Sequence, residues 1–260
     1  MNLQEWIEKN RGVVDWSLFD EPWDAMQLTH NPFRTEQIDA ILAASRLLQK
    51  RTGTVLDLGC GPGVLGRQIL NQRPHLHYIG ADGDPLMLAA VGELVSVPNV
   101  RTMLVDLRKT EWAEGLTPQF DSVVSLTALH WLSQPHQRAL YGAVYQILKP
   151  GGTFVVGDPY APEDPEERKE FDPLEELAKQ NEGGQTWEEF WKGFFTRYPI
   201  RQLYADYHKD KGYQEPCEGT DDGYPLSFQL NALREAGFGK PAIFWKKGLR
   251  VVYGGMKYDS

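Results

Sequence analysis

The chain has 260 residues, of which 41% are hydrophobic, and its formal net charge is −9 at neutral pH. A chain of this length and composition can bury the core of one domain together with an accessory region. The acidic balance argues against a nucleic-acid partner, because binding phosphates requires Lys and Arg clustered on one face.

The sequence carries no signal for export, membrane insertion or metal binding. Residues 1–9 lack an apolar signal core, and no segment approaches the roughly 18 consecutive apolar residues that would span a bilayer. The two cysteines, Cys60 and Cys217, are too far apart to form a disulfide framework or a metal cluster. We therefore expect a cytoplasmic chain with no metal and no membrane partner.

Aromatic residues are frequent near the N-terminus, ahead of a helix predicted over Thr35 to Lys50. The apolar residues of this helix follow a helical period, at Ile38, Ile41, Leu42 and Leu48. The aromatic residues that precede it are Trp6, Trp16, Phe19, Trp23 and Phe33. Residues 1–50 are therefore predicted to form a helical cap, which could bring Trp16, Trp23 or His30 near a ligand.

The segment Val55-Leu-Asp-Leu-Gly-Cys-Gly-Pro-Gly63 is an apolar stretch that ends in three glycines at alternate positions. A strand can end in a tight turn that is open to a ligand only where φ can be positive and no Cβ intervenes, which favours glycine. Apolar residues then follow at the spacing of a buried helical face, namely Val64, Leu65, Ile69 and Leu70. The motif predicts a strand, a turn and a helix that bind a nucleotide-type ligand.

These glycines also allow a nicotinamide cofactor. Gly61-Pro-Gly63-Val-Leu-Gly66 satisfies the G-x-G-x-x-G pattern of dinucleotide-binding domains, and Asp82 lies near the spacing of about 20 residues that accompanies it. The register differs, because the glycines begin at Gly59 and the acidic residue Asp57 lies in the end of the strand.

This register resembles motif I of the class I S-adenosylmethionine-dependent methyltransferases, and the resemblance extends over roughly residues 53–154. Tyr78-Ile-Gly-Ala-Asp82 is similar to that family's second strand, which ends in the acid that holds the ribose hydroxyls. One carboxylate can accept both of those hydrogen bonds. The following Asp84-Pro85 predicts a helix N-cap with proline at the first helical position.

Val100-Arg-Thr-Met-Leu-Val-Asp106 is similar to the family's third strand, after which adenine binds. The resemblance implies that Asp106 accepts from the exocyclic amine and that the Leu107 N–H donates to the ring. Phe120–Leu126 and Leu148–Val156 match the fourth and fifth strands. The residues that the resemblance assigns to S-adenosylmethionine binding are Asp57, Gly59, Cys60, Gly61, Gly63, Asp82, Gly83, Asp106, Leu107, Ser125 and His130.

The segment Ser125-Leu-Thr-Ala-Leu-His-Trp-Leu132 follows the fourth strand, at the edge where doubly wound folds bind ligands. It is similar to the segment found in small-molecule methyltransferases of the trans-aconitate methyltransferase kind. His130 is thus the candidate catalytic base, and a hydrogen-bonded structural role fits it equally well. Asp158-Pro159-Tyr160 is similar to a nucleobase methyltransferase motif but follows the fifth strand instead of the fourth, which argues against nucleobase methylation.

Residues 161–225 hold 8 Lys plus Arg, 17 Asp plus Glu and 11 of the 30 aromatic residues, so all of the excess negative charge lies there. This aromatic content exceeds that of a disordered acidic linker. After Thr186, a candidate N-cap, a helix is predicted from the aromatic spacing of Trp187, Phe190, Trp191, Phe194 and Phe195. The aromatic face of this helical insert either packs on the protein body or lines the acceptor pocket as a lid.

The segment Leu226 to Phe238 predicts a helix that stops at Gly237, and Ala242–Trp245 and Leu249–Tyr253 predict two closing strands. The resemblance implies an α/β, Rossmann-like sheet of seven strands in the order 3-2-1-4-5-7-6, with the last strand antiparallel and helices on both faces. The expected regions are the cap (residues 1–50), the core (residues 51–160 and 226–260) and the insert (residues 161–225).

The resulting interpretation is S-adenosylmethionine-dependent methyl transfer to a small-molecule acceptor by in-line displacement, at oxygen, nitrogen or carbon. Two alternatives stay open. One is an NAD(P)-dependent oxidoreductase that uses Gly61, Gly63 and Gly66. The other is a member of the same fold that binds S-adenosylmethionine without methylating.

Overall fold

The computed structural model describes residues 1–95, 97–116, 119–164, 166–171, 173, 176, 185–212 and 219–258, so Cys217 and part of the insert lie outside it. The strands are β1 (Gly53–Leu58), β2 (Leu76–Asp82), β3 (Val100–Leu104), β4 (Phe120–Leu126), β5 (Leu148–Pro159), β6 (Gly239–Lys247) and β7 (Arg250–Met256). The α-helices are α1 (Leu3–Asn10), α2 (Glu21–His30), α3 (Arg34–Ala44), α4 (Val64–Gln72), α5 (Pro85–Leu94), α6 (Gln134–Ile147), α8 (Trp187–Arg197), α9 (Arg201–Asp210) and α10 (Leu226–Glu235). Short 3-10 helices are η1 (Trp16–Phe19), η2 (Leu47–Gln49), η3 (Glu111–Ala113) and η4 (Leu129–Trp131).

All seven strands form one sheet in the order β3-β2-β1-β4-β5-β7-β6. Strands β1 to β5 pair in parallel, whereas β7 is antiparallel to both of its neighbours, β5 and β6. The predicted order and the antiparallel last strand are confirmed. Nowhere in the described residues is a helix long and apolar enough to cross a membrane.

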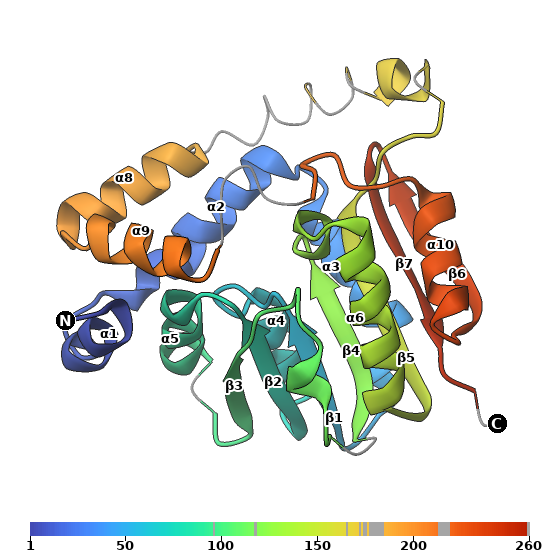
Figure 1. Ribbon diagram of the computed structural model, residues 1–260, viewed down its shortest axis with the longest axis horizontal. Coiled ribbons are helices and arrows are strands. Elements are labelled where there is room, and N and C mark those ends of the chain that lie inside the picture. The colour runs from blue at the N-terminus through green and yellow to red at the C-terminus, as the bar shows by residue number, and fades with distance from the viewer. Residues whose placement is uncertain are drawn as a thin grey trace.

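The sheet separates two hydrophobic layers, because successive side chains of a strand point to opposite faces. Val55 of β1 belongs to the layer that contains α3, α4 and α5, and Leu56 and Leu58 belong to the layer that contains α6 and α10. Figure 1 shows α6 and α10 on one face of the sheet and α3 and α4 on the other. Covering both faces explains why β1 and β4 are buried at most of their positions.

Two elements are shorter in the structure than the sequence predicts. The helix expected over Thr35 to Lys50 ends at Ala44, because Arg46 adopts a left-handed conformation with φ of +57°. The Ser45 carbonyl there accepts a hydrogen bond from Thr153 Oγ1 of β5 at 2.9 Å, so a tertiary contact stabilises the break. Strand β3 ends at Leu104, which leaves Asp106 in the loop that follows it.

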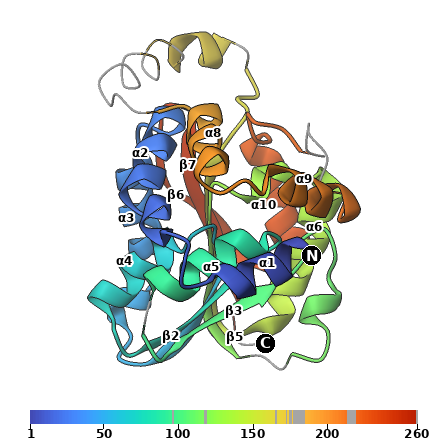
Figure 2. The same ribbon diagram turned by 90° about the vertical axis from the view of Figure 1, so that its left-hand side faces the viewer.

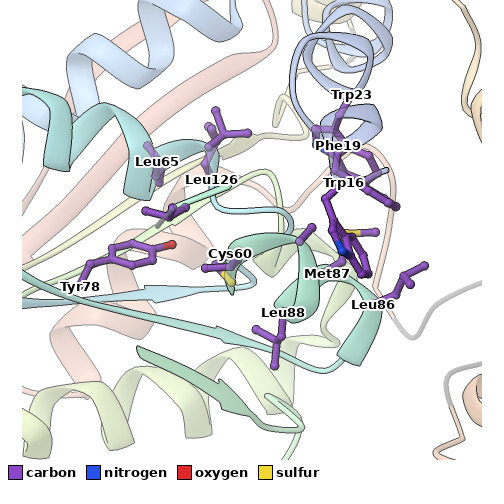
Figure 3. Close-up of a cluster of buried hydrophobic side chains, with 14 of the residues drawn as sticks. Trp16, Phe19, Trp23, Cys60, Leu65, Tyr78, Leu86, Met87, Leu88 and Leu126 are labelled. Carbon is purple, nitrogen blue, oxygen red and sulfur yellow. The ribbon is translucent and has the colours of Figure 1, made fainter. Parts of the chain in front are cut away.

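Helices α8 and α9 of the insert pack on the N-terminal helices α2 and α1, and Figure 2 shows α8 beside α2. The ring of Phe19 lies 5.6 Å from that of Phe190 and 5.2 Å from that of Phe194. Figure 3 shows how the buried Trp16, Phe19 and Trp23 lie on the side of α5. The aromatic face of α8 therefore packs on the body of the protein.

Candidate active site

The three glycines after β1 adopt left-handed conformations, with φ of +65° at Gly59, +51° at Gly61 and +86° at Gly63. The Gly59 N–H donates to the Ala81 carbonyl at 2.8 Å, which fixes the turn against β2. A Cβ at Gly59 would lie 2.4 Å from Ala128 Cβ, whereas one at Gly61 would meet no atom within 4 Å. Gly59 thus allows the β1 turn to touch the loop after β4, and Gly61 faces open space that a ligand could fill.

Asp82 ends β2 beside this turn. Its Oδ2 accepts from the Gly61 N–H at 2.8 Å, and its Oδ1 accepts from the Asp84 N–H at 2.9 Å. Burial, together with the charge of Asp84, raises the pKa of Asp82 to about 6. Each carboxylate oxygen can accept two hydrogen bonds, so both oxygens keep capacity for ligand hydroxyls.

The residues that follow Asp82 begin α5. The Asp84 Oδ1 accepts from the Leu86 N–H at 2.8 Å, so the predicted N-cap is confirmed. The Gly83 carbonyl accepts from the Tyr207 hydroxyl of α9 at 2.9 Å. Burial and the nearby carboxylates raise the pKa of Tyr207 to about 12, which keeps this phenol protonated as a donor. The turn after β2 is therefore covered by the insert.

Asp57 lies below the turn and is 1% exposed. The Tyr78 hydroxyl donates to its Oδ2 at 2.7 Å, and Oδ1 has no hydrogen-bond partner among the described residues. Burial is the main cause that raises the pKa of Asp57 to about 7. A Cβ at Gly66 would lie 2.5 Å from the Tyr78 ring. The third glycine of the apparent dinucleotide pattern thus makes room for the tyrosine that holds Asp57.

Asp106 is already engaged by a side chain that sequence reasoning did not consider. Arg108 donates from Nε and Nη2 to the two oxygens of Asp106, at 2.9 and 2.8 Å. Burial opposes this charge, but the hydrogen bonds from Arg108 outweigh it and lower the pKa of Asp106. The Leu107 N–H makes no hydrogen bond within the described chain, so it remains available as a donor.

A hollow of about 370 Å³ lies next to Asp106 at the carboxyl end of β3. Its lining residues are Leu104, Val105, Asp106, Lys109, Glu111 and Trp112. Arg108 also donates to the carbonyls of Lys211 and Gly212 at 2.6 and 2.8 Å, which ties the end of α9 to this edge.

Two further predicted cofactor residues have structural partners. The Cys60 thiol donates to the Gly61 carbonyl at 3.4 Å, and burial raises its pKa so that it stays protonated. The Ser125 hydroxyl donates to the Leu58 carbonyl at 2.7 Å and joins the end of β4 to the end of β1. Both side chains hold the edge together, and their contact with a cofactor stays a prediction.

His130 lies in η4 and is buried against Asp158, which is fully buried at the end of β5. Its Nδ1 lies 2.9 Å from Asp158 Oδ1, and its backbone N–H donates to Asp158 Oδ2 at 3.1 Å. The Ala128 N–H donates to the same carboxylate at 3.0 Å. An Nδ1–H that donates to Asp158 leaves Nε2 as the basic nitrogen, which makes no hydrogen bond in the described chain. The sequence placed Asp158 after β5 but gave no sign of this pairing.

Arg34 is the second functional candidate that the sequence did not reveal. It begins α3, is 6% exposed, and donates from Nη1 to the Thr127 hydroxyl at 3.3 Å. Of the three residues that could lie near a ligand, Trp16 and Trp23 are buried in the aromatic packing around Phe19, and the nearness of Trp16, Trp23 or His30 to a ligand stays a prediction. A single arginine in a helix carries no pattern that distinguishes it from a surface arginine.

Taken together, the sheet order, the left-handed glycine turn and the acids at the carboxyl ends of β1, β2 and β3 define a Rossmann-like fold of the methyltransferase type. Residues 56–154 match the family described as a methyltransferase domain. Over that part, the chain is similar to S-adenosylmethionine-dependent methyltransferases.

Two curated proteins and one solved structure illustrate this similarity. A trans-aconitate 2-methyltransferase of Deinococcus radiodurans is 33% identical over 138 residues, which cover 51% of this chain and 50% of that protein. A protein of the same name from Variovorax paradoxus is 29% identical, covering 60% and 54%. Human N-acetylserotonin methyltransferase, solved in complex with SAM, superposes with a TM-score of 0.53 at 16% identity, covering 98% of this chain and 62% of that one. The matches to the curated relatives span about half of their length.

Proposed function

We propose that this chain transfers a methyl group from S-adenosylmethionine to a small-molecule acceptor. The observation that carries the proposal is the carboxyl edge, where a left-handed glycine turn with open space at Gly61 lies beside Asp82 and above Asp57. A Gly-rich turn lets a ligand approach the backbone closely, and a carboxylate after the second strand suits ribose hydroxyls. The proteins named trans-aconitate 2-methyltransferase, which match over about half of their length, and the similar fold solved with SAM support the same assignment.

Residues at the carboxyl ends of the strands would each bind a different part of the cofactor. In this proposal the glycine turn, with Gly59, Cys60, Gly61 and Gly63, receives its central part. Asp82 and Gly83 receive the ribose, Asp106 and Leu107 receive the adenine, and Ser125 and His130 lie on the β4 side. When bound, the sulfonium supplies an activated methyl group, so the protein needs no nucleophile of its own. Its task is to align the acceptor and to exclude water.

His130 would remove the proton of a hydroxyl acceptor. Asp158 accepts from Nδ1, which orients the ring and leaves Nε2 to take the proton. We expect His130→Gln and Asp158→Asn to lower turnover about 10²-fold or more, the scale of a lost general base, with the affinity for S-adenosylhomocysteine changed less than about twofold. If His130→Gln keeps the wild-type turnover, His130 has a packing role and is not the base.

The cofactor assignment is tested by calorimetry with S-adenosylhomocysteine and NADH in parallel. The proposal expects binding of the former only. Binding of NADH without binding of S-adenosylhomocysteine would instead assign the glycines to a nicotinamide cofactor. Incubation with a metabolite extract and S-adenosylmethionine labelled in its methyl group then identifies the product. A chain that binds the sulfonium compound but transfers its 3-amino-3-carboxypropyl group, or nothing, would be a non-methylating member of the fold.

A further inference from the structure

The backbone around His130 is supported from outside its own segment by a buried side chain of α6. Gln137 donates from Nε2 to the Leu129 carbonyl at 2.8 Å and to the Leu132 carbonyl at 3.2 Å. Its side chain is fully buried, and its Oε1 accepts from Gln229 Nε2 of α10 at 3.0 Å. The amide of Gln137 is thus itself fixed, and it sets the position of both ends of η4.

A second support comes from residues 219–224, which lead from the insert back to α10 and which we call the return segment. The Thr220 N–H donates to the His130 carbonyl at 3.0 Å, and the Gly219 N–H donates to the Trp131 carbonyl at 3.0 Å. A Cβ at Gly219 would lie 2.0 Å from the His130 carbonyl oxygen, so this close approach requires glycine. The return segment therefore lies directly on the peptide unit that joins His130 to Trp131.

The return segment also contacts the end of β5, where Asp158 lies. A Cβ at Gly223 would lie 2.1 Å from the carbonyl oxygen of Pro159, the residue after Asp158. The Gly223 N–H donates to the Thr220 carbonyl at 3.1 Å, which closes a turn between the two contacts. One short segment of the insert thus touches the backbone on both sides of the pair formed by His130 and Asp158.

The loop that leads to His130 begins with a strained residue. Thr127 has a φ of +50°, a region that β-branched residues rarely adopt. Such conformations persist only where the surroundings over-determine them, and they concentrate at functional sites. The Thr127 N–H donates to the Gly157 carbonyl of β5 at 2.7 Å, and the Ala128 N–H donates to Asp158 at 3.0 Å. Support of this kind is what a catalytic base needs, because its geometry must be fixed before the acceptor binds.

We propose that the return segment and Gln137 are positioning elements for His130, which fix η4 so that the imidazole stays paired with Asp158 and presents Nε2 in one orientation. This inference rests on the proposed function, in which His130 takes the proton of a hydroxyl acceptor. The proton passes from the acceptor oxygen to Nε2, and the electron pair left on that oxygen forms the bond to the methyl carbon. The carbon–sulfur bond breaks, and its electrons leave with S-adenosylhomocysteine. Both positioning elements act through His130 and add no reacting group.

Gly219→Ala tests this inference, because the added Cβ must move the return segment or η4. Label transfer from methyl-labelled S-adenosylmethionine to a metabolite extract should fall about 10- to 100-fold, the scale of a misplaced catalytic group, while the Kd of S-adenosylhomocysteine changes less than about twofold. The second readout is the Nδ1 proton of His130 in the S-adenosylhomocysteine complex of the protein labelled with ¹⁵N-histidine, assigned by its loss in His130→Gln. This proton should exchange with water at least about tenfold faster, because its hydrogen bond to Asp158 opens more often.

Gly193→Ala is the matched control, because Gly193 lies in α8 of the same insert and a Cβ there meets no atom within 4 Å. It should leave label transfer and proton exchange at their wild-type values. Gln137→Met removes the two hydrogen bonds from α6 to η4 and should reproduce both effects of Gly219→Ala. It decides the matter if Gly219→Ala does not fold.

A fall in label transfer together with faster exchange of the Nδ1 proton supports the inference. Wild-type values of both in Gly219→Ala or in Gln137→Met would overturn it, while the proposed function would still rest on His130→Gln. A fall in label transfer with unchanged proton exchange would overturn it too, because the return segment would then act on the acceptor and not on His130. Wild-type label transfer in His130→Gln would instead refute the base itself.

Discussion

Replacing Asp57 with asparagine should make the ligand-free protein relatively more stable as the pH rises. The pKa of Asp57 is raised by burial from its ordinary value of 3.8 to about 7. Between these values the folded chain keeps a proton that the unfolded chain has lost, so the wild-type stability falls as pH increases. Above pH 7 the full penalty of the buried charge is present. Asparagine has no such titration and can still accept from Tyr78.

The size of the effect follows from the two pKa values. For a single group with pKa 3.8 unfolded and about 7 folded, linkage predicts that the wild type loses roughly 2–3 kcal/mol relative to Asp57→Asn between about pH 5 and pH 8. An amide nitrogen at the position of the unpartnered Oδ1 adds a constant cost of about 1–3 kcal/mol. The constant cost shifts the whole curve without changing its slope, so the variant should gain roughly 2–3 kcal/mol on the wild type between pH 5 and pH 8.

Urea unfolding of both proteins at pH 5, 6, 7 and 8 measures this difference. Asp121→Asn is the control, because Asp121, near the start of β4, has a pKa shifted in the opposite direction from that of Asp57. Burial raises its pKa, but hydrogen bonds from Lys149, Thr54 and Lys50 outweigh burial and hold the pKa below the ordinary value. Its stability difference should be constant over this range. A difference for Asp57→Asn that is also constant from pH 5 to pH 8 would refute the reasoning that Asp57 carries a desolvated charge.

Three more substitutions probe the edge. Gly59→Ala should destabilise the protein by about 2–4 kcal/mol in urea unfolding, because the cost of a positive φ and the cost of the clash with Ala128 add together. Gly142→Ala in helix α6 is the control and should not destabilise the protein, because a Cβ there meets no atom within 4 Å. Equal effects of the two would contradict the geometry. Asp82→Ala should weaken S-adenosylhomocysteine binding about 10- to 100-fold by calorimetry, and an unchanged Kd would reject its ribose role. Arg108→Met should speed hydrogen exchange in α9 without affecting α6; equal protection would show that Arg108 does not hold α9.

The sequence predicts those parts of the fold whose determinants are local. The glycine turn needs positive φ at three alternate positions, and three alternate glycines are visible in the chain. The Thr186–Glu189 capping box and the Asp84 cap are likewise short-range patterns, and the structure contains both. Where a tertiary contact decides, as at Ser45, the helix ends earlier than its apolar period indicates.

The polar pairs of the site could not be predicted in this way. Asp158 and His130 are separated by the whole of α6 and meet only because β4 and β5 are neighbouring parallel strands. Arg34 meets Thr127 only once α3 has packed on the sheet. Each of these residues taken alone is a common surface type, and what distinguishes it is burial, which sequence spacing does not encode.

The aromatic packing between α8, η1 and α2 joins helices that contact different parts of the site. Helix α8 has eleven residues, too few to be stable alone, so it depends on burying its aromatic face against η1 and α2. Helix α9 follows α8 and holds the Gly83 carbonyl through Tyr207, whereas α2 carries Asp24 beside Arg34. Helices α2 and α9, which contact different parts of the site, are thus joined through one aromatic cluster. A movement of α2 that exposes Arg34 must strain the packing of α8, and therefore the contact of α9 with the turn after β2.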